Sequence, residues 1–123
     1  MAVVAKLRSL SCSDTPSLEA FQPEGPFGIY IDAMIGPANG PGEESFGFTL
    51  CTPEWLAENM KDPFVLGRHY LFVKEYDYAA LERYVRDYCQ RCMGSSWSEV
   101  AGKVAYLGYW EFENYTPYRE SDR

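Results

Sequence analysis

The most recognisable chemistry in this sequence belongs to Cys89 and Cys92, which are spaced as Cys-x-x-Cys. This spacing occurs in thioredoxin-like redox sites and in zinc knuckles. A reactive thiolate is stabilised at a helix N-terminus, whereas this pair falls in the last turns of a predicted helix. A structural zinc site would need a second close pair of ligands, and Cys12, Cys51 and His69 are isolated. We therefore expect Cys89 and Cys92 to pack in the core as reduced thiols.

His69 is the only histidine, and it lies inside a segment, residues 65–74, that predicts a β-strand. A lone histidine can act as a general base when a carboxylate or another group orients it. No serine or cysteine stands at a spacing that implies a nucleophile and base pair, so a structural or exposed histidine is the simpler interpretation. A small enzyme that uses His69 with a nearby carboxylate stays open as an alternative function.

Acidic residues form two groups. Glu111 and Glu113 are two residues apart, so they share a face of a strand. Together with Asp32 they can in principle bind calcium or perform acid/base chemistry, although charge that guards an exposed sheet edge is the simpler interpretation. Glu43 and Glu44 lie in a Gly/Pro-rich loop that matches no phosphate-binding pattern and would repel phosphate.

The composition narrows the class of protein. A chain of 123 residues with 46% hydrophobic content predicts one domain over residues 1–123, with a core that needs no metal, disulfide or cofactor. A net charge of −7 disfavours nucleic acid as a partner and suits a basic protein. No apolar run is long enough to cross a bilayer, and the first residues lack an export signal, so we expect a cytoplasmic protein without membrane contact.

The structural centre is predicted in residues 27–56. Apolar residues alternate at 29–35 and at 46–50, which predicts two strands that each have one apolar face. The polar loop between them is too long for a two-residue turn, and the strands are expected to pair antiparallel. Thr52 then caps a helix that begins at Pro53.

The flanking segments predict further strands and helices from their periodicity and capping residues. The resulting class is α+β: an antiparallel β-sheet with helices packed mainly on one face. In chain order we expect a strand at 3–12, a loop at 13–26, the strand at 65–74, a helix from Asp77 to Gly94, a helix from Ser96 to Gly108, an extended segment at 110–115 and a frayed tail from Thr116.

Side chains of the predicted helices divide between core and solvent. Trp55 and Trp97 lie on stripes that face the sheet, so truncating either to alanine is expected to cost about 3–5 kcal/mol. On the solvent side of the long helix, the i,i+4 spacing predicts two ion pairs, Glu82 with Arg86 and Asp87 with Arg91.

The order of these segments also resembles a known family. Three segments follow one another in the chain: IGP, a Gly/Glu-rich loop and SFGFTLCTPEWL. The segment FQPEGPFG lies upstream of them and WEFENY lies downstream. The set is similar to the strand-loop-strand-helix signature of the immunity protein 8 family, bacterial antitoxins encoded with polymorphic toxins. This resemblance covers most of the chain. It implies a non-enzymatic protein that binds a cognate toxin domain and occludes its active site, and the acidity of the chain would suit a basic nuclease.

Candidate toxin-binding residues come from the two acidic groups. Glu43 and Glu44 are the first candidates, because polar loops on a rigid sheet commonly carry recognition, and Glu111 and Glu113 are the second. The same loop can equally be an ordinary solvated turn. Outside toxin neutralisation, the alternatives are the enzyme with His69 and a structural or adaptor domain of a larger complex, which the gene neighbourhood would distinguish.

The first testable prediction concerns metals and disulfides. Because the cysteines are scattered and the apolar content is sufficient for a core, a chelator and a reductant should leave the melting temperature of the purified protein nearly unchanged. Thermal unfolding followed by circular dichroism measures this, and a loss of several degrees with either reagent would contradict the prediction.

Overall fold

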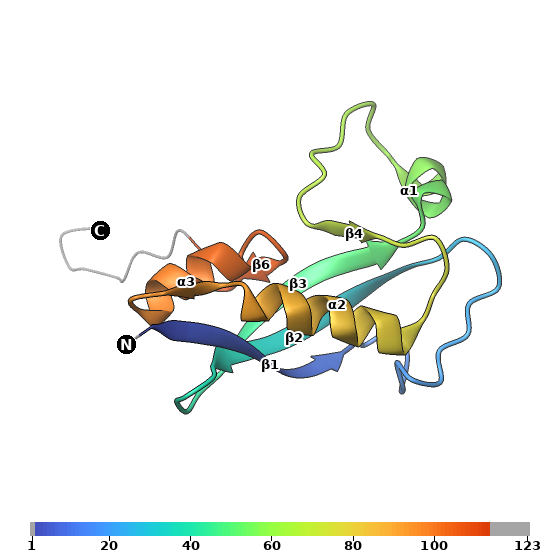
Figure 1. Ribbon diagram of the computed structural model, residues 1–123. Helices are drawn as coiled ribbons and strands as arrows, with labels where there is room; N and C mark the ends of the chain where they lie inside the picture. Colours follow the sequence, from blue (N-terminus) through green and yellow to red (C-terminus); the bar gives the residue numbers. More distant parts are fainter. Residues whose placement is uncertain (1, 114–123) are drawn as a thin grey trace.

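The computed structural model describes residues 2–113 and has an α+β fold, built on a curled mixed sheet (Figure 1). The main path of the sheet runs β4-β3-β2-β1-β5, and β6 also pairs with β3. The predicted fold class is confirmed. The elements are β1 (Val3–Ser11), β2 (Gly28–Pro37), β3 (Glu44–Cys51), α1 (Pro53–Asn59), β4 (Tyr70–Phe72), α2 (Tyr78–Gln90), β5 (Met93–Gly94), α3 (Trp97–Val104) and β6 (Tyr109–Trp110).

The central β2–β3 pair is antiparallel, as the sequence predicts, and its register runs from Gly28 opposite Cys51 to Ile35 opposite Glu44. β1 pairs antiparallel with the other edge of β2, with a bulge between Leu7 and Ser9. Because the bulge adds a residue to one strand, it shifts the alternation of side chains, which explains why β1 lacks a single period-two pattern.

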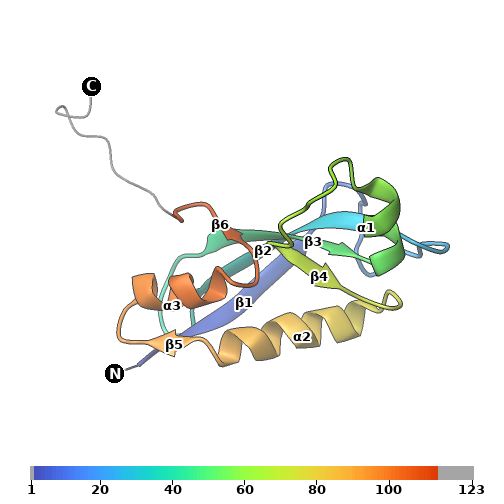
Figure 2. The ribbon, with the colours of Figure 1, turned by 90° about the horizontal axis from the view of Figure 1, so that it is seen from above.

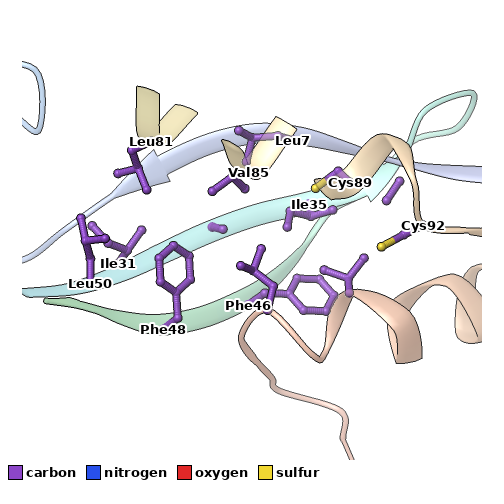
Figure 3. Packing of buried hydrophobic residues seen from close by; sticks show 14 of the residues in the cluster. Leu7, Ile31, Ile35, Phe46, Phe48, Leu50, Leu81, Val85, Cys89 and Cys92 are labelled. Atoms are coloured by element: carbon purple, nitrogen blue, oxygen red, sulfur yellow. The ribbon is translucent and has the colours of Figure 1, made fainter. Parts of the chain in front are cut away.

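The apolar face of β1 to β3 is buried beneath α2 and α3, and we call it the inner face (Figure 2). Figure 3 shows Leu81 and Val85 of α2 packed over the side chains of this face. The predicted antiparallel strands therefore obtain their stability from a common core. Its largest fully buried side chains include Ile31, Ile35, Phe46, Phe48, Leu50, Val85, Val100 and Val104.

The opposite side of the sheet is called the outer face. α1 lies toward this side, so that the three helices do not share one layer (Figure 2). Gly28 alternates with the buried Ile29, and a Cβ atom at Gly28 would lie 2.3 Å from Cε2 of Trp55. The ring of Trp55 therefore covers the backbone of Gly28 at one end of the outer face.

The two tryptophans predicted for the core are only half-buried. Trp55 lies on the outer face, where water reaches one side of α1. Trp97 borders the core, with its ring edge-on to Phe46 at 6.5 Å between centroids, and its Nε1 donates a hydrogen bond to Glu44. Trp97 thus packs against the core as predicted, whereas the prediction for Trp55 was wrong because α1 lies on the outer face and has no buried residue.

The strand predicted at residues 65–74 is wrong in length, since only Tyr70–Phe72 pairs with β3. The preceding residues 60–69 form an irregular connection. β4 is parallel to β3, whereas the other strand pairs in residues 2–113 are antiparallel. A parallel neighbour requires a crossover connection, and α1 with residues 60–69 provides it.

The helix predicted to end at Gly94 ends earlier, at Gln90. Gly94 is no left-handed cap but belongs to β5, where it pairs with Val3 of β1. Asp77 caps α2 as predicted, accepting a hydrogen bond from the N–H of Ala80 at 3.2 Å. Edge pairing with β1 supplies partners for the backbone that follows the helix.

Of the two ion pairs predicted on α2, Glu82 with Arg86 is confirmed at 2.8 Å. In the described part of the chain, Arg91 does not pair with Asp87, and its guanidinium lies 5.8 Å from the ring centroid of Tyr88. Arg91 is the C-terminal cap residue of α2, outside the regular helix in which i,i+4 side chains are neighbours.

At the C-terminal side, Ser96 caps α3 as predicted, but the helix ends at Val104, not near Gly108. The extended segment predicted at 110–115 is shortened to β6, and a turn follows in which the N–H of Glu113 donates to the carbonyl of Trp110. Residues 114 and 115 of that segment, and the tail predicted from Thr116, lie outside the described residues.

Thr52 generates the second testable prediction. Its hydroxyl oxygen accepts hydrogen bonds from the N–H groups of Phe27 and Trp55, both at 3.3 Å, and its side chain is buried. Thr52→Val keeps the shape but leaves both donors without this acceptor, so it should lower the free energy of unfolding by about 2 kcal/mol. Urea denaturation measures this difference. Thr52→Ser is the matched control, and equal losses in the two variants would contradict a role for the hydroxyl.

Candidate functional site

His69 is buried just before β4, with 4% of its surface exposed. Its Nε2 lies 2.5 Å from the carbonyl oxygen of Ala105 and donates a hydrogen bond to it in the neutral tautomer. The ring also contacts Tyr109 edge-on, at 4.3 Å between centroids. His69 therefore connects β4 to the segment after α3, and solvent has little access to it.

The charge state of His69 follows from this burial. Desolvation lowers its pKa below the ordinary value of 6.5, partly opposed by the hydrogen bond to Ala105, and the nearby Arg68 lowers it further. Among residues 2–113 no carboxylate hydrogen-bonds to the ring, and Nδ1 has no hydrogen-bond partner. Glu113 lies near enough to oppose the lowering of the pKa, but within residues 2–113 no carboxylate orients the ring through a hydrogen bond.

The four cysteines are free, buried thiols. Cys89 and Cys92 lie in the core, as predicted, and burial raises the pKa of Cys89 to about 12. A thiol with so high a pKa is a poor nucleophile and a poor metal ligand at neutral pH. Within residues 2–113, no group of three or more potential ligands is placed to hold a metal ion.

The acidic candidates are brought together across a long sequence separation. Pairing of β6 with β3 places Glu111 beside Ser45, whose N–H donates to the Glu111 carboxylate at 3.5 Å. The Ser45 hydroxyl donates to Asp32 at 3.4 Å. Asp32 and Glu111 thus lie on either side of Ser45, at the end of the sheet from which the exposed Glu43 projects.

The other two acidic candidates are each bound by another side chain of the same protein. Glu44 accepts a hydrogen bond from Nε1 of Trp97, so its carboxylate lies toward α3 and the inner face. Glu113 forms an ion pair with Arg68. The two carboxylates of each predicted pair therefore have different roles. Glu43 and Glu111 are exposed, whereas Glu44 and Glu113 each connect two segments of the protein.

Aromatic residues on the outer face were missed by the sequence reasoning. Strand register places Tyr30, Thr49 and Tyr70 in one row across β2, β3 and β4. The next row contains Asp32, Gly47 and Tyr109, from β2, β3 and β6. Alternation with the buried isoleucines of β2 was the available signal, because it assigns Tyr30 and Asp32 to the face opposite the core.

Residues 60–69 carry a second exposed apolar feature. Phe64 is 89% exposed and Leu66 is 85% exposed, and Leu66 belongs to the segment predicted as a strand. This connection rises from α1 and returns to the β4 edge (Figure 1). Large apolar side chains held in water in this way are characteristic of contact surfaces.

The segments that carry the family resemblance have clear structural roles. In FQPEGPFG, the rings of Phe21 and Phe27 pack edge-on with Tyr76. In WEFENY, Trp110 stacks on Phe46 at 6.2 Å between centroids. These contacts pack the two segments against the core, so their aromatic residues have a structural role without contact to a partner.

Together, the fold and the exposed groups define a small α+β protein that presents one face of its sheet. The chain matches the family model described as Immunity protein 8 over residues 5–115, and it belongs to that family. Membership supports a toxin-neutralising role in general, and such families are generally non-enzymatic. No curated protein and no solved structure gives a significant match.

The helices of the described structure are short, and α2 and α3 are amphipathic. Across residues 2–113, none is both long enough and apolar enough to cross a bilayer.

The third testable prediction concerns the ionisation of His69, which gives a single histidine signal because the chain has one histidine. Because folding lowers its pKa, the histidine of the unfolded chain binds a proton more readily than that of the folded protein at pH values between the folded-state pKa and 6.5. The free energy of unfolding should therefore be fully retained above pH 6.5 and should fall as the pH is lowered through that window. An NMR titration of the imidazole should show a midpoint below that of the urea-unfolded protein; a midpoint at or above it would contradict the buried, neutral ring.

Proposed function

We propose that this protein binds a cognate toxin domain in the cytoplasm and neutralises it by occluding its active site. Membership of the immunity protein 8 family is the observation that carries this proposal. Inhibition by occlusion requires a rigid surface but no catalytic group of the inhibitor. The outer face, where Tyr30, Phe72 and Tyr109 are exposed, lies on a sheet whose other face is packed, and it supplies such a surface.

A basic toxin domain, such as a nuclease, is the partner that the charge supports. The chain has a net charge of −7, and the exposed carboxylates of Glu43 and Glu111 lie at the same end of the sheet. Opposite charges accelerate encounter, and this effect weakens as salt screens them over about 8 Å at physiological ionic strength. Toxin association should therefore slow with increasing salt.

The enzyme alternative has little support from the geometry. His69 is buried, and its Nε2 is bound to the Ala105 carbonyl oxygen. A general base must reach the proton that it removes, directly or through one water molecule. No feature of the described residues specifically favours the adaptor alternative over toxin binding.

The fourth testable prediction is that the gene directly upstream of the gene for this chain encodes a toxin domain and that this domain is the partner. Co-expression of the wild-type protein should restore growth of cells that express the toxin domain, and the purified proteins should form a complex. Glu43→Lys and Glu111→Lys should each reduce the association rate by about 3- to 10-fold at low salt and flatten its salt dependence, because attraction is replaced by repulsion. Stopped-flow kinetics measures both quantities.

Asp87→Lys is the matched control, since it reverses an exposed charge on α2, away from the outer face. Glu44 is left unchanged because its bond to Trp97 would confound binding with stability. If Asp87→Lys slows association with the toxin as much as Glu43→Lys and Glu111→Lys do, the proposed acidic contacts are contradicted. Failure of the wild-type protein to bind or to rescue growth would contradict the proposed function itself.

A further inference from the structure

Asp32 and the tyrosines on either side of it form a polar and aromatic site on the outer face. We propose that this site, formed by Asp32, Tyr30 and Tyr109, receives an arginine side chain from a basic toxin surface. The inference rests on the proposed function and adds to it the recognition chemistry and the face that the toxin covers.

The position of the site follows from strand register. Asp32 of β2 pairs with Gly47 of β3, and Gly47 pairs with Tyr109 of β6. Neighbouring strands lie about 4.8 Å apart, so Asp32 and Tyr109 are separated by one strand whose residue has no side chain. This places a carboxylate and an aromatic residue on either side of Gly47.

The ring of Tyr30 occupies the space over Gly47. A Cβ atom at Gly47 would lie 1.8 Å from the Tyr30 hydroxyl oxygen and 2.5 Å from Cζ, so the ring lies across the backbone of Gly47. Glycine is required there because any side chain would displace the ring. Tyr30 remains 43% exposed and Tyr109 remains 52% exposed, so both rings are available to a partner.

The side chains around the site are already held in place. The Tyr109 hydroxyl donates to the carbonyl oxygen of Arg68 at 3.4 Å, and its ring contacts His69. Asp32 accepts a hydrogen bond from the Ser45 hydroxyl. Because these groups are ordered before binding, less conformational entropy is lost when a partner arrives, which favours affinity.

The chemistry of the site selects a guanidinium group. A carboxylate can accept two parallel hydrogen bonds from arginine, and the faces of tyrosine rings attract the same cation. The nearby cation Arg68 is paired with Glu113, and the carboxylate of Glu111 lies next to Ser45. The surroundings therefore complement a basic surface and disfavour an acidic one.

The apolar neighbours extend the contact beyond one side chain. Tyr70 and Phe72 stack at 6.1 Å between centroids on the β4 side of the same face, and Phe72 is exposed. Aromatic residues around a desolvated charge are typical of the energetic centre of an interface. A toxin covering this face would exclude water from Asp32 and so strengthen its interaction with arginine.

The test measures binding of the same upstream-encoded toxin domain by isothermal titration calorimetry and stopped-flow kinetics. Asp32→Asn should weaken binding at least about 30-fold and flatten the salt dependence, since the amide can still accept from Ser45 but carries no charge. Tyr30→Ala should weaken binding at least about 10-fold without changing the salt dependence, whereas Tyr30→Phe should stay within about 3-fold of wild type.

Tyr84→Ala is the matched control, because Tyr84 is also 49% exposed but belongs to α2. Melting temperatures establish that each variant is folded. If the wild-type protein binds the toxin and Asp32→Asn and Tyr30→Ala bind equally well, the arginine site is overturned while the proposed function stands. If the wild-type protein does not bind, both fail. Analytical ultracentrifugation tests whether a second copy of the chain occupies the face instead. If the wild-type protein is a dimer that Tyr30→Ala dissociates, and toxin affinity is unchanged, the inference is also overturned.

Discussion

Burial of the inner face of the β2–β3 pair is the interaction on which the rest of the structure depends. Ile31, Phe46 and Phe48 are fully buried there, and together they form the surface onto which α2 and α3 pack. Burying side chains of this size contributes about 1.5–3 kcal/mol each, more than any exposed ion pair can supply. Since the side chains of a strand alternate, committing one face to the core leaves the residues between them for the other face.

That division has a consequence for function. The outer face can carry tyrosines, a carboxylate and a glycine because it does not have to support helices along its length. α1 covers only the end near Gly28, through the ring of Trp55. The two short strands β4 and β6 both pair with β3, and they bring Tyr70 and Tyr109 to this face from distant parts of the chain. The stable core and the open surface are therefore two sides of the same strands.

Charge is divided in a comparable way. Glu44 and Glu113 bind other side chains of the protein, Trp97 and Arg68 respectively, while the exposed carboxylates of Glu43 and Glu111 face solvent. Glu43 and Glu44 differ because Glu43 precedes β3 whereas Glu44 begins it with its side chain toward the inner face, and Glu111 and Glu113 differ because they lie in the turn after β6. An acidic chain that neutralises a toxin needs some of its carboxylates free and others paired, and the sheet provides both arrangements.

The sequence alone determined the parts that depend on local periodicity and capping: the β2–β3 pair, the caps at Thr52, Asp77 and Ser96, and the α+β class. The family resemblance was likewise present in the order of the motifs. Only the tertiary structure decided the extent and direction of β4, the end of α2 and the partner of each carboxylate. The site at Asp32 required pairing between β2, β3 and β6, and contacts between segments so far apart leave no periodic signal in the chain. Local propensities fix which residues are extended or helical, but the competition among distant partners for the same sheet edge fixes where each extended segment pairs.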